Sequence, residues 1–167
     1  MYFLPFRTAV TESEEETAHL GALLAEWMSD GITILLSGEL GAGKTTLVRG
    51  FCEALGFSKV RSPSFTLVNH YQAGNRQIVH SDLYRLTPGD VEDLDLQEHD
   101  SGNTVFFIEW AEKTEFLSER PLWRIVIFSP DILRFPERRS FEFTALNDTG
   151  EDFLSLFWET IGEACHK

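Results

Sequence analysis

Short apolar runs alternate along this chain with segments in which apolar residues recur at helical spacing. Residues 32–37 (ITILLS) and 104–108 (TVFFI) are continuous apolar runs, typical of strands buried on both faces of a parallel sheet. Residues 65–71 and 77–81 lie around the turn Ala73-Gly74-Asn75, an arrangement that favours a hairpin. The pattern therefore predicts a parallel core with antiparallel strands beside it.

Helical segments separate these strands. The first helix is predicted to follow Ser13, which forms a capping box with Glu16, and to end at Asp30-Gly31. Further helices are predicted at residues 45–55, 88–98 and 151–164. An edge strand is predicted at residues 2–7, and an antiparallel pair at residues 123–128 and 140–145.

This order of elements predicts an α/β fold of three layers, with a mixed sheet that has a parallel core and antiparallel flanking strands. A chain of 167 residues without a Pro-, Gly- or Ser-rich linker is most simply one domain, so residues 1–167 are expected to form a single unit. Residues 146–167 are then a helical C-terminal extension. Leu154, Phe157, Trp158 and Ile161 share one face of this helix, which either packs on the domain or contacts a partner.

Charge restricts the kind of function. The chain has 14 Lys and Arg against 27 Asp and Glu, a net charge of -13, so it repels phosphates at long range. A function on nucleotides or nucleic acid therefore needs a local phosphate trap or a basic partner. No apolar run approaches the roughly 18 residues of a membrane helix, and no signal peptide pattern is seen. Cys52 and Cys165 form no disulfide framework, so a cytoplasmic protein without membrane contact is expected.

A phosphate trap is present in the segment from Gly38 to Thr45, which fits G-x-x-x-x-G-K-[ST] at every fixed position. A buried strand precedes it and a helix follows, so we expect a P-loop NTPase-like domain. Backbone amides and the helix N-terminus would surround phosphate oxygens. Lys44 would bind the β- and γ-phosphates, and the Thr45 hydroxyl would bind Mg²⁺. The residues expected to contact the nucleotide here are Glu39, Leu40, Gly41, Ala42, Gly43, Lys44, Thr45 and Thr46.

Acidic residues follow two of the predicted strands. Glu109 comes directly after the apolar run 104–108, like the acid of a Walker B strand, and Asp82 follows Ile78-Val79-His80-Ser81. Ligands gather beyond the carboxyl ends of parallel strands, so Glu109 and Asp82 are candidate catalytic and Mg²⁺-binding residues together with Lys44 and Thr45. A helix cap or a surface ion pair is the alternative for each.

Three other features have two readings each. His80 is either a hydrogen-bonded core residue or a participant in catalysis. Arg85 either neutralises phosphate charge or pairs with the acids that follow it. These acids are either a solvated surface or a docking surface for a basic partner: Asp90, Glu92, Asp93, Asp95, Glu98 and Asp100.

The sequence contains no N-K-x-D, the guanine-reading motif of GTPases, so ATP is the expected nucleotide. A partner-dependent ATPase is the leading hypothesis. A small-molecule P-loop kinase is the alternative, although no arginine-rich lid segment is seen between the strands. A nucleotide-gated binding module is a third class, and Glu109 disfavours it because hydrolysis needs an acid at that position.

Four segments in fixed order resemble the TsaE family, formerly YjeE, over about residues 10–145. They are GELGAGKTT (38–46), SPSF (62–65), HSDLYR (80–85) and FIEW (107–110). The resemblance implies an ATPase required for threonylcarbamoyladenosine formation at adenosine 37 of tRNAs that read codons starting with A. It also implies TsaD and TsaB as partners, ATP hydrolysis that resets the transferase and is slow without those partners, and contact with tRNA only through the complex.

The resemblance also implies roles for single residues. Lys44 holds phosphates, Thr45 and Glu109 bind Mg²⁺, and Asp82 assists the metal or the water. A switch that senses the γ-phosphate is implied for Ser62, Pro63, Ser64 and Phe65, with His80 and Arg85 assigned to it as well. Trp110 would lie near the nucleotide, although a core position is equally compatible with its sequence. Arg139 would lie near the base and ribose, and Thr11 on the same side. Ser64 stands where the family usually has Thr, which keeps the hydroxyl.

Overall fold

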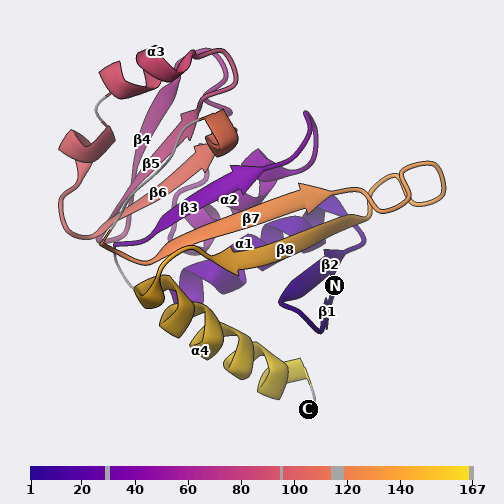
Figure 1. Cartoon of the computed structure of the whole chain (residues 1–167). Helices are drawn as coiled ribbons and strands as arrows, with labels where there is room; N and C mark the ends of the chain where they lie inside the picture. Colours follow the sequence, from indigo (N-terminus) through magenta and orange to yellow (C-terminus); the bar gives the residue numbers. More distant parts are fainter. Residues whose placement is uncertain (29–30, 95, 114–118, 166–167) are drawn as a thin grey trace.

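The computed structural model describes residues 1–28, 31–94, 96–113 and 119–165 and contains one eight-stranded sheet (Figure 1). Its strands are β1 (Tyr2–Leu4), β2 (Thr8–Thr11), β3 (Thr33–Ser37), β4 (Val68–Ala73), β5 (Arg76–Asp82), β6 (Thr104–Glu109), β7 (Leu122–Phe128) and β8 (Arg139–Ala145). The helices are α1 (Glu14–Trp27), α2 (Lys44–Ala54), α3 (Pro88–Asp93), α4 (Asp148–Cys165) and the short 3₁₀ helices η1 (Leu96–His99) and η2 (Ala111–Lys113).

The strand order β1-β2-β8-β7-β3-β6-β5-β4 puts β3 near the middle of the sheet. β3 runs parallel to β6 and β7, and β5 runs parallel to β6, whereas the pairs β4–β5, β7–β8, β2–β8 and β1–β2 are antiparallel. The predicted mixed sheet, with a parallel core and antiparallel flanking strands, is therefore confirmed. Within the parallel core the carboxyl ends of β3, β5 and β6 lie at one edge, where the loop between β3 and α2 also lies.

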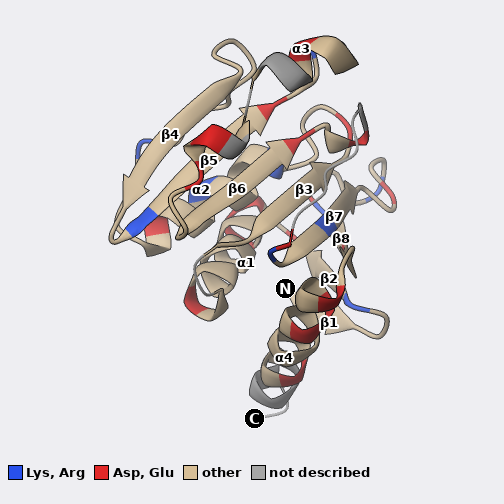
Figure 2. Ribbon diagram, turned by 60° about the vertical axis from the view of Figure 1, so that its left-hand side comes forward, with Lys and Arg blue, Asp and Glu red and all other residues tan. Residues whose placement is uncertain are grey.

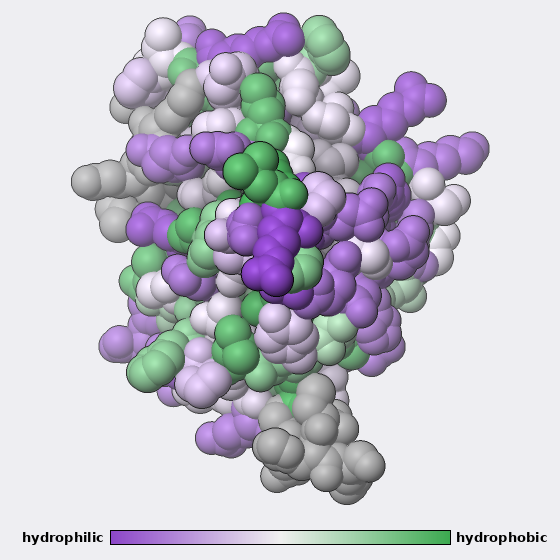
Figure 3. Space-filling model, turned by 90° about the vertical axis from the view of Figure 1, so that its right-hand side faces the viewer, coloured by the Kyte–Doolittle hydropathy of each residue, from purple (hydrophilic) through white to green (hydrophobic). Residues whose placement is uncertain are grey.

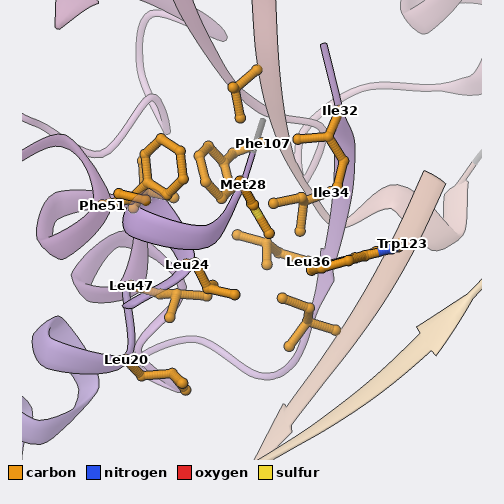
Figure 4. Packing of buried hydrophobic residues seen from close by; sticks show 14 of the residues in the cluster. Leu20, Leu24, Met28, Ile32, Ile34, Leu36, Leu47, Phe51, Phe107 and Trp123 are labelled. Atoms are coloured by element: carbon orange, nitrogen blue, oxygen red, sulfur yellow. The ribbon is translucent and has the colours of Figure 1, made fainter. Parts of the chain in front are cut away.

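Helices cover both faces of the sheet. On one face, α1, α2 and α4 close the larger hydrophobic cluster, in which Phe51 packs edge-on against Phe107 with ring centroids 5.0 Å apart (Figure 4). On the other face, α3 and η1 cover a smaller cluster around Val79, Phe106 and Ile108. This arrangement agrees with the three layers expected from the sequence. No helix among the described residues has both the length and the apolar content that a membrane span requires.

Helices α1 and α2 touch backbone to backbone. A Cβ atom added at Gly50 would lie 1.9 Å from the carbonyl oxygen of Ala18, and one added at Gly21 would lie 2.1 Å from that of Leu47. Both distances are far below van der Waals contact, so only glycine allows this approach. The close packing fixes the start of α2, and with it the loop that precedes the helix.

Some elements differ from the sequence expectation. Helix α1 begins after its cap Ser13, as predicted, but it ends at Trp27. Asp30 lies outside the described residues. The helix predicted at 88–98 is wrong as a single element, because α3 ends at Asp93 and η1 begins at Leu96; Asp95 between them lies outside the described residues. Strand β2, which pairs with β8, was not predicted.

Candidate nucleotide site

The loop Gly38–Gly43 connects β3 to α2 and forms the floor of the candidate site. Gly43 is the N-cap of α2 and has a φ of 104°, in the left-handed region where glycine is unstrained. A Cβ atom at Gly38 would lie 2.5 Å from the carbonyl oxygen of Ile127, so the loop passes close to β7. The loop therefore places the N-terminus of α2 at the edge of the sheet. The free backbone amides of a helix N-terminus favour binding of an anion.

Lys44 is the first residue of α2 and is only 5% exposed. Its Nζ donates to the carbonyl oxygens of Gly38 at 2.6 Å and of Glu39 at 3.0 Å, and it lies 4.5 Å from the ring centroid of Trp110. Burial lowers the pKa of Lys44 below that of an ordinary lysine, and the neighbouring carboxylates of Glu109 and Asp82 offset part of this lowering. The ammonium is thus held in the loop by weak carbonyl acceptors that a phosphate can replace.

Trp110 has an uncommon backbone conformation for a non-glycine residue, with a φ of 61°. Its backbone N–H donates to the carbonyl oxygen of Leu36 at 3.0 Å, and its ring lies 4.9 Å from that of Tyr84. The indole both lines the cavity and packs against the smaller hydrophobic cluster. Trp110 is thus partly packed against the core, and its place beside the cavity leaves open the interpretation as a neighbour of the nucleotide.

Asp82 and Glu109 end β5 and β6, and they are paired directly across these parallel strands. In Figure 2 the arrows of β5 and β6, the strands that end with these residues, have the red of acidic residues at their tips. Each residue is only 4% exposed. Because Glu109 is also in register with Leu36 of β3, its carboxylate lies beside the loop that carries Lys44. The alternative reading as surface ion pairs is excluded by this burial.

The Glu109 carboxylate accepts two hydrogen bonds on the same oxygen. Thr45 Oγ1 donates to Glu109 Oε1 at 3.1 Å, and His80 Nε2 lies 2.8 Å from the same atom. Thr45 belongs to α2 and His80 to β5, so Glu109 connects the helix to the neighbouring strand.

The Asp82 carboxylate is tied to the segment 62–65. Ser64 Oγ donates to Asp82 Oδ2 at 2.8 Å, and Ser62 Oγ lies 2.7 Å from Ser64 Oγ. Asp82 Oδ1 accepts from the backbone N–H of Tyr84 at 2.8 Å. The Ser64 hydroxyl therefore links this segment to the acid. Movement of the segment would change the partners of Asp82.

The phosphate loop and the acids surround one cavity of about 460 Å³. It is lined by Glu14, Thr17, Leu40, Gly41, Ala42, Gly43, Lys44, Thr45, Thr46, Ser62, Asp82, Glu109, Trp110, Glu137 and Arg139. Most of the residues singled out in the sequence thus come together in space. Arg139, at the start of β8, lies across the cavity from the acids, and its guanidinium donates to the carbonyl oxygens of Pro136 and Arg138.

Several residues singled out in the sequence do not line this cavity. Thr11 is fully buried, and its hydroxyl lies 2.9 Å from that of Thr17, which does line it. Glu39 contributes only its carbonyl oxygen to Lys44. Outside the lining are also Pro63, Ser64, Phe65, His80 and Arg85. Of these, Phe65 is 84% exposed and has the Arg85 guanidinium 4.6 Å from its ring centroid.

Three lining residues were missed in the sequence. Glu14 and Thr17 lie one helical turn apart at the start of α1, where no motif marks them. Glu137 stands two residues before Arg139. In an extended segment this spacing places two side chains on the same face, so the sequence could have indicated that both face the cavity. With Asp82 and Glu109, the cavity holds four carboxylates against Lys44 and Arg139.

The oxygen atoms at this edge fit a magnesium ion better than a softer metal. Thr45, Asp82 and Glu109 offer hydroxyl and carboxylate oxygens on one wall of the cavity. Among the described residues no group of three or more His, Cys, Asp or Glu forms a complete metal cage. Mg²⁺ is usually held by one or two carboxylates together with phosphates, and these residues match the part of such a site that a protein supplies.

Comparisons with known proteins agree with the resemblance. A family model described as threonylcarbamoyl adenosine biosynthesis protein TsaE matches residues 11–136. A TsaE protein of Bacillus subtilis is 36% identical over 142 residues, which cover 84% of this chain and 87% of the relative. One of Nostoc is 43% identical over 108 residues, covering 62% of this chain and 67% of the relative. The crystal structure of YdiB from Bacillus subtilis superposes with a TM-score of 0.73 at 30% identity, covering 92% of this chain and 94% of that one.

Proposed function

Because the chain belongs to the TsaE family and so takes part in tRNA threonylcarbamoyladenosine biosynthesis, we propose that it is the ATPase of that pathway. The observation that carries this proposal is the meeting of a complete phosphate loop with two buried strand-end acids at one cavity. The cytoplasm, where tRNA is modified, is its proposed location.

In this proposal ATP is the substrate, and its phosphates lie over the loop. Backbone amides of residues 39–46 and the N-terminus of α2 bind the phosphate oxygens. The Lys44 ammonium leaves the carbonyl oxygens of Gly38 and Glu39 for the β- and γ-phosphates, which are stronger acceptors. Arg139 and Glu137, on the opposite side of the cavity, border the space left for the ribose and adenine.

Thr45, Glu109 and Asp82 are proposed to hold Mg²⁺ together with the phosphates. When bound, this ion neutralises charge that develops on the phosphates during transfer. Glu109 has a second proposed task, to orient the attacking water. Asp82 is proposed to act as the contact through which Ser64 and the segment 62–65 respond to the γ-phosphate.

TsaD and TsaB are the proposed partners, and ATP hydrolysis is proposed to reset the transferase that they form. Two features support a partner-dependent and otherwise slow enzyme. The cavity wall has more carboxylates than cations, and Arg85 lies on Phe65 rather than at the cavity. A cation supplied by a partner would complete the charge stabilisation that phosphoryl transfer requires.

The direct test is ATP hydrolysis by the purified protein with and without the TsaB–TsaD pair of the same organism. We expect slow release of ADP and phosphate from the protein alone and faster release from the mixture. Glu109→Gln should reduce hydrolysis far more than ATP affinity, because the lost charge acts mainly in the transition state. GTP should compete poorly with ATP.

Two results would overturn the proposal. One is phosphate transfer to a small-molecule acceptor without net hydrolysis, which would make the protein a kinase. The other is equal binding of GTP and ATP combined with no response to TsaB–TsaD.

A further inference from the structure

We propose that His80 is a positioning residue that fixes the Glu109 carboxylate for ATP hydrolysis, an inference that rests on the proposed ATPase function. His80 lies on β5, one strand away from the phosphate loop, and its side chain is fully buried. It does not line the cavity. Any effect on ATP must therefore pass through another residue.

The contact between His80 and Glu109 has a defined direction. His80 Nε2 lies 2.8 Å from Glu109 Oε1, and an ionised carboxylate can only accept hydrogen bonds. The Nε2 atom therefore carries the hydrogen and donates it. The imidazole ring is rigid, so this donor stands at one place relative to β5.

Glu109 is held from two elements at once. Thr45 donates to Oε1 from α2, and His80 donates to the same atom from β5. Within the described part of the chain, no side chain or backbone group donates to the second oxygen, Oε2. One oxygen is thus anchored by the protein, and the other is left for a water or a metal ion in the cavity that Glu109 lines. Without His80, only the Thr45 hydroxyl would orient this carboxylate.

A second observation concerns the other ring nitrogen. His80 Nδ1 is buried and has no hydrogen-bond partner among the described residues. A buried polar atom without a partner is destabilising, and an apolar side chain would fill the same space without that cost. Packing alone does not explain a histidine here, whereas a donor for Glu109 does.

The choice of test variants follows from side-chain reach. A glutamine amide nitrogen stands about as far from the backbone as Nε2 of histidine, so His80→Gln keeps a donor for Glu109. An asparagine amide stands where Nδ1 does, so His80→Asn keeps polarity but not the contact. His70→Asn is the matched control, because His70 lies exposed on the adjacent strand β4.

The experiment measures kcat with TsaB–TsaD, the affinity for an ATP analogue, and the unfolding midpoint of each variant. For His80→Asn we expect kcat to fall about 10- to 100-fold, the usual loss when a group that orients a ligand is removed. Analogue affinity should change little, because the phosphate loop is intact. His80→Gln should recover most of kcat, and His70→Asn should match the wild type.

A double variant tests whether His80 acts through Glu109. In the Glu109→Gln background, His80→Asn should cause no further loss of kcat, because the group that it positions is already inactive. Equal kcat in His80→Asn and wild type would overturn the inference, and so would independent losses that multiply. A parallel loss of kcat, affinity and unfolding midpoint in both His80 variants would make His80 structural. Failure of the wild type to hydrolyse ATP at all would instead overturn the proposed function.

Discussion

At the scale of single residues, a few neighbouring positions determine the geometry of the phosphate loop. Gly38, Gly43 and Lys44 belong to one continuous motif, and their geometry follows from local rules for glycine and for a helix N-terminus. Lys44 adds the one mobile charge. Its Nζ donates to two loop carbonyl oxygens, which are the neutral acceptors that the proposed phosphates would replace.

Lys44→Ala should therefore weaken ATP binding while the fold survives. Hydrogen bonds to charged groups contribute about 1.5–3 kcal/mol, which corresponds to a loss of affinity of roughly 10- to 150-fold. Turnover should fall below detection. Titration with a fluorescent ATP analogue measures the affinity, and the unfolding midpoint serves as the control for folding. Unchanged affinity would refute the assignment of the phosphate loop.

Most residues of the phosphate loop and the two strand-end acids were predicted to lie at the cavity and do, whereas other motif residues lie outside it and residues that reach it only through folding were missed. Glu109 and Asp82 could be paired from the sequence because each ends an apolar strand. Glu14 and Thr17 come from α1, and only the close contact of α1 with α2 brings them to the loop. Thr11 does not line the cavity, but its hydroxyl is hydrogen-bonded to that of Thr17, which does.

At the scale of elements, the contact between α1 and α2 determines where the phosphate loop lies. Gly50→Ala would place a methyl group 1.9 Å from the Ala18 carbonyl oxygen, which is backbone and cannot rotate away. The helices must then separate. Overpacking typically costs 1–3 kcal/mol, and we expect a loss of about 3 kcal/mol or more in the free energy of unfolding.

Gly89→Ala is the matched control for this prediction. A Cβ atom at Gly89 would meet nothing within 4 Å, and alanine favours the helical conformation of α3. Urea unfolding should show this variant to be as stable as the wild type or slightly more stable. If Gly50→Ala behaved like Gly89→Ala, the helices would not be in the close contact described.

Helix α4 is tied to the turn between β1 and β2 by an ion pair whose effect depends on pH. Arg7 donates to Glu151 with distances of 2.8 and 2.5 Å. Chiefly through this hydrogen bond, the pKa of Glu151 falls from 4.5 to about 2. A lowered folded-state pKa gives stability that is present above pH 4.5 and is lost as the pH falls toward 2.

Glu151→Gln should accordingly lower the unfolding midpoint slightly at pH 7, because the pair is exposed. The difference from wild type should shrink as the pH is lowered from about 4.5 to about 2. Glu159→Gln, on the same helix and without an ion pair in the described part of the chain, is the control. A difference that stays constant over this pH range would contradict the predicted role of the pair.

Elements with a strong local signal were the ones predicted well. The apolar runs that became β3 and β6 are short, continuous and rich in β-branched and aromatic residues, which is the pattern of strands buried on both faces. Strand β2 has only four residues, and it lies between the three-residue strand β1 and β8, which comes more than 120 positions later in the chain. The segment 88–98 was predicted as one helix, but its described residues form two short helices, α3 and η1.

At the scale of the whole molecule, the end that holds the cavity exposes both hydrophobic and hydrophilic side chains. Figure 3 looks onto this end and shows hydrophobic side chains among hydrophilic ones. Leu40 of the phosphate loop is 70% exposed, and Leu133, in the loop between β7 and β8, is 95% exposed. Glu137 of the same loop and Arg139, the first residue of β8, both line the cavity. A partner that binds here would contact apolar side chains and the nucleotide together.

The net charge of the whole molecule determines how well the protein alone can bind tRNA. The net charge is -13, and several of the 14 basic residues are already engaged within the chain. Ion pairs with acids of the same chain engage Arg7, Arg49, Arg120 and Arg138. Arg76 is bound to carbonyl oxygens at the end of α1, and Lys44 is buried in the loop. Binding to a phosphate backbone requires several such side chains on one surface.

We therefore predict that the isolated protein binds tRNA with a Kd weaker than about 10⁻⁴ M at physiological salt, the weak limit of non-specific binding. The protein together with TsaB–TsaD should shift tRNA in the same gel assay, with the basic surface supplied by the partners. TsaB–TsaD without this protein is the control that separates its contribution. Because counterion release makes backbone binding steeply dependent on salt, titrations at low and at physiological salt distinguish a weak phosphate contact from none. Tight and salt-sensitive binding by the lone protein would show that a basic surface exists despite the ion pairs, and that tRNA reaches this chain directly.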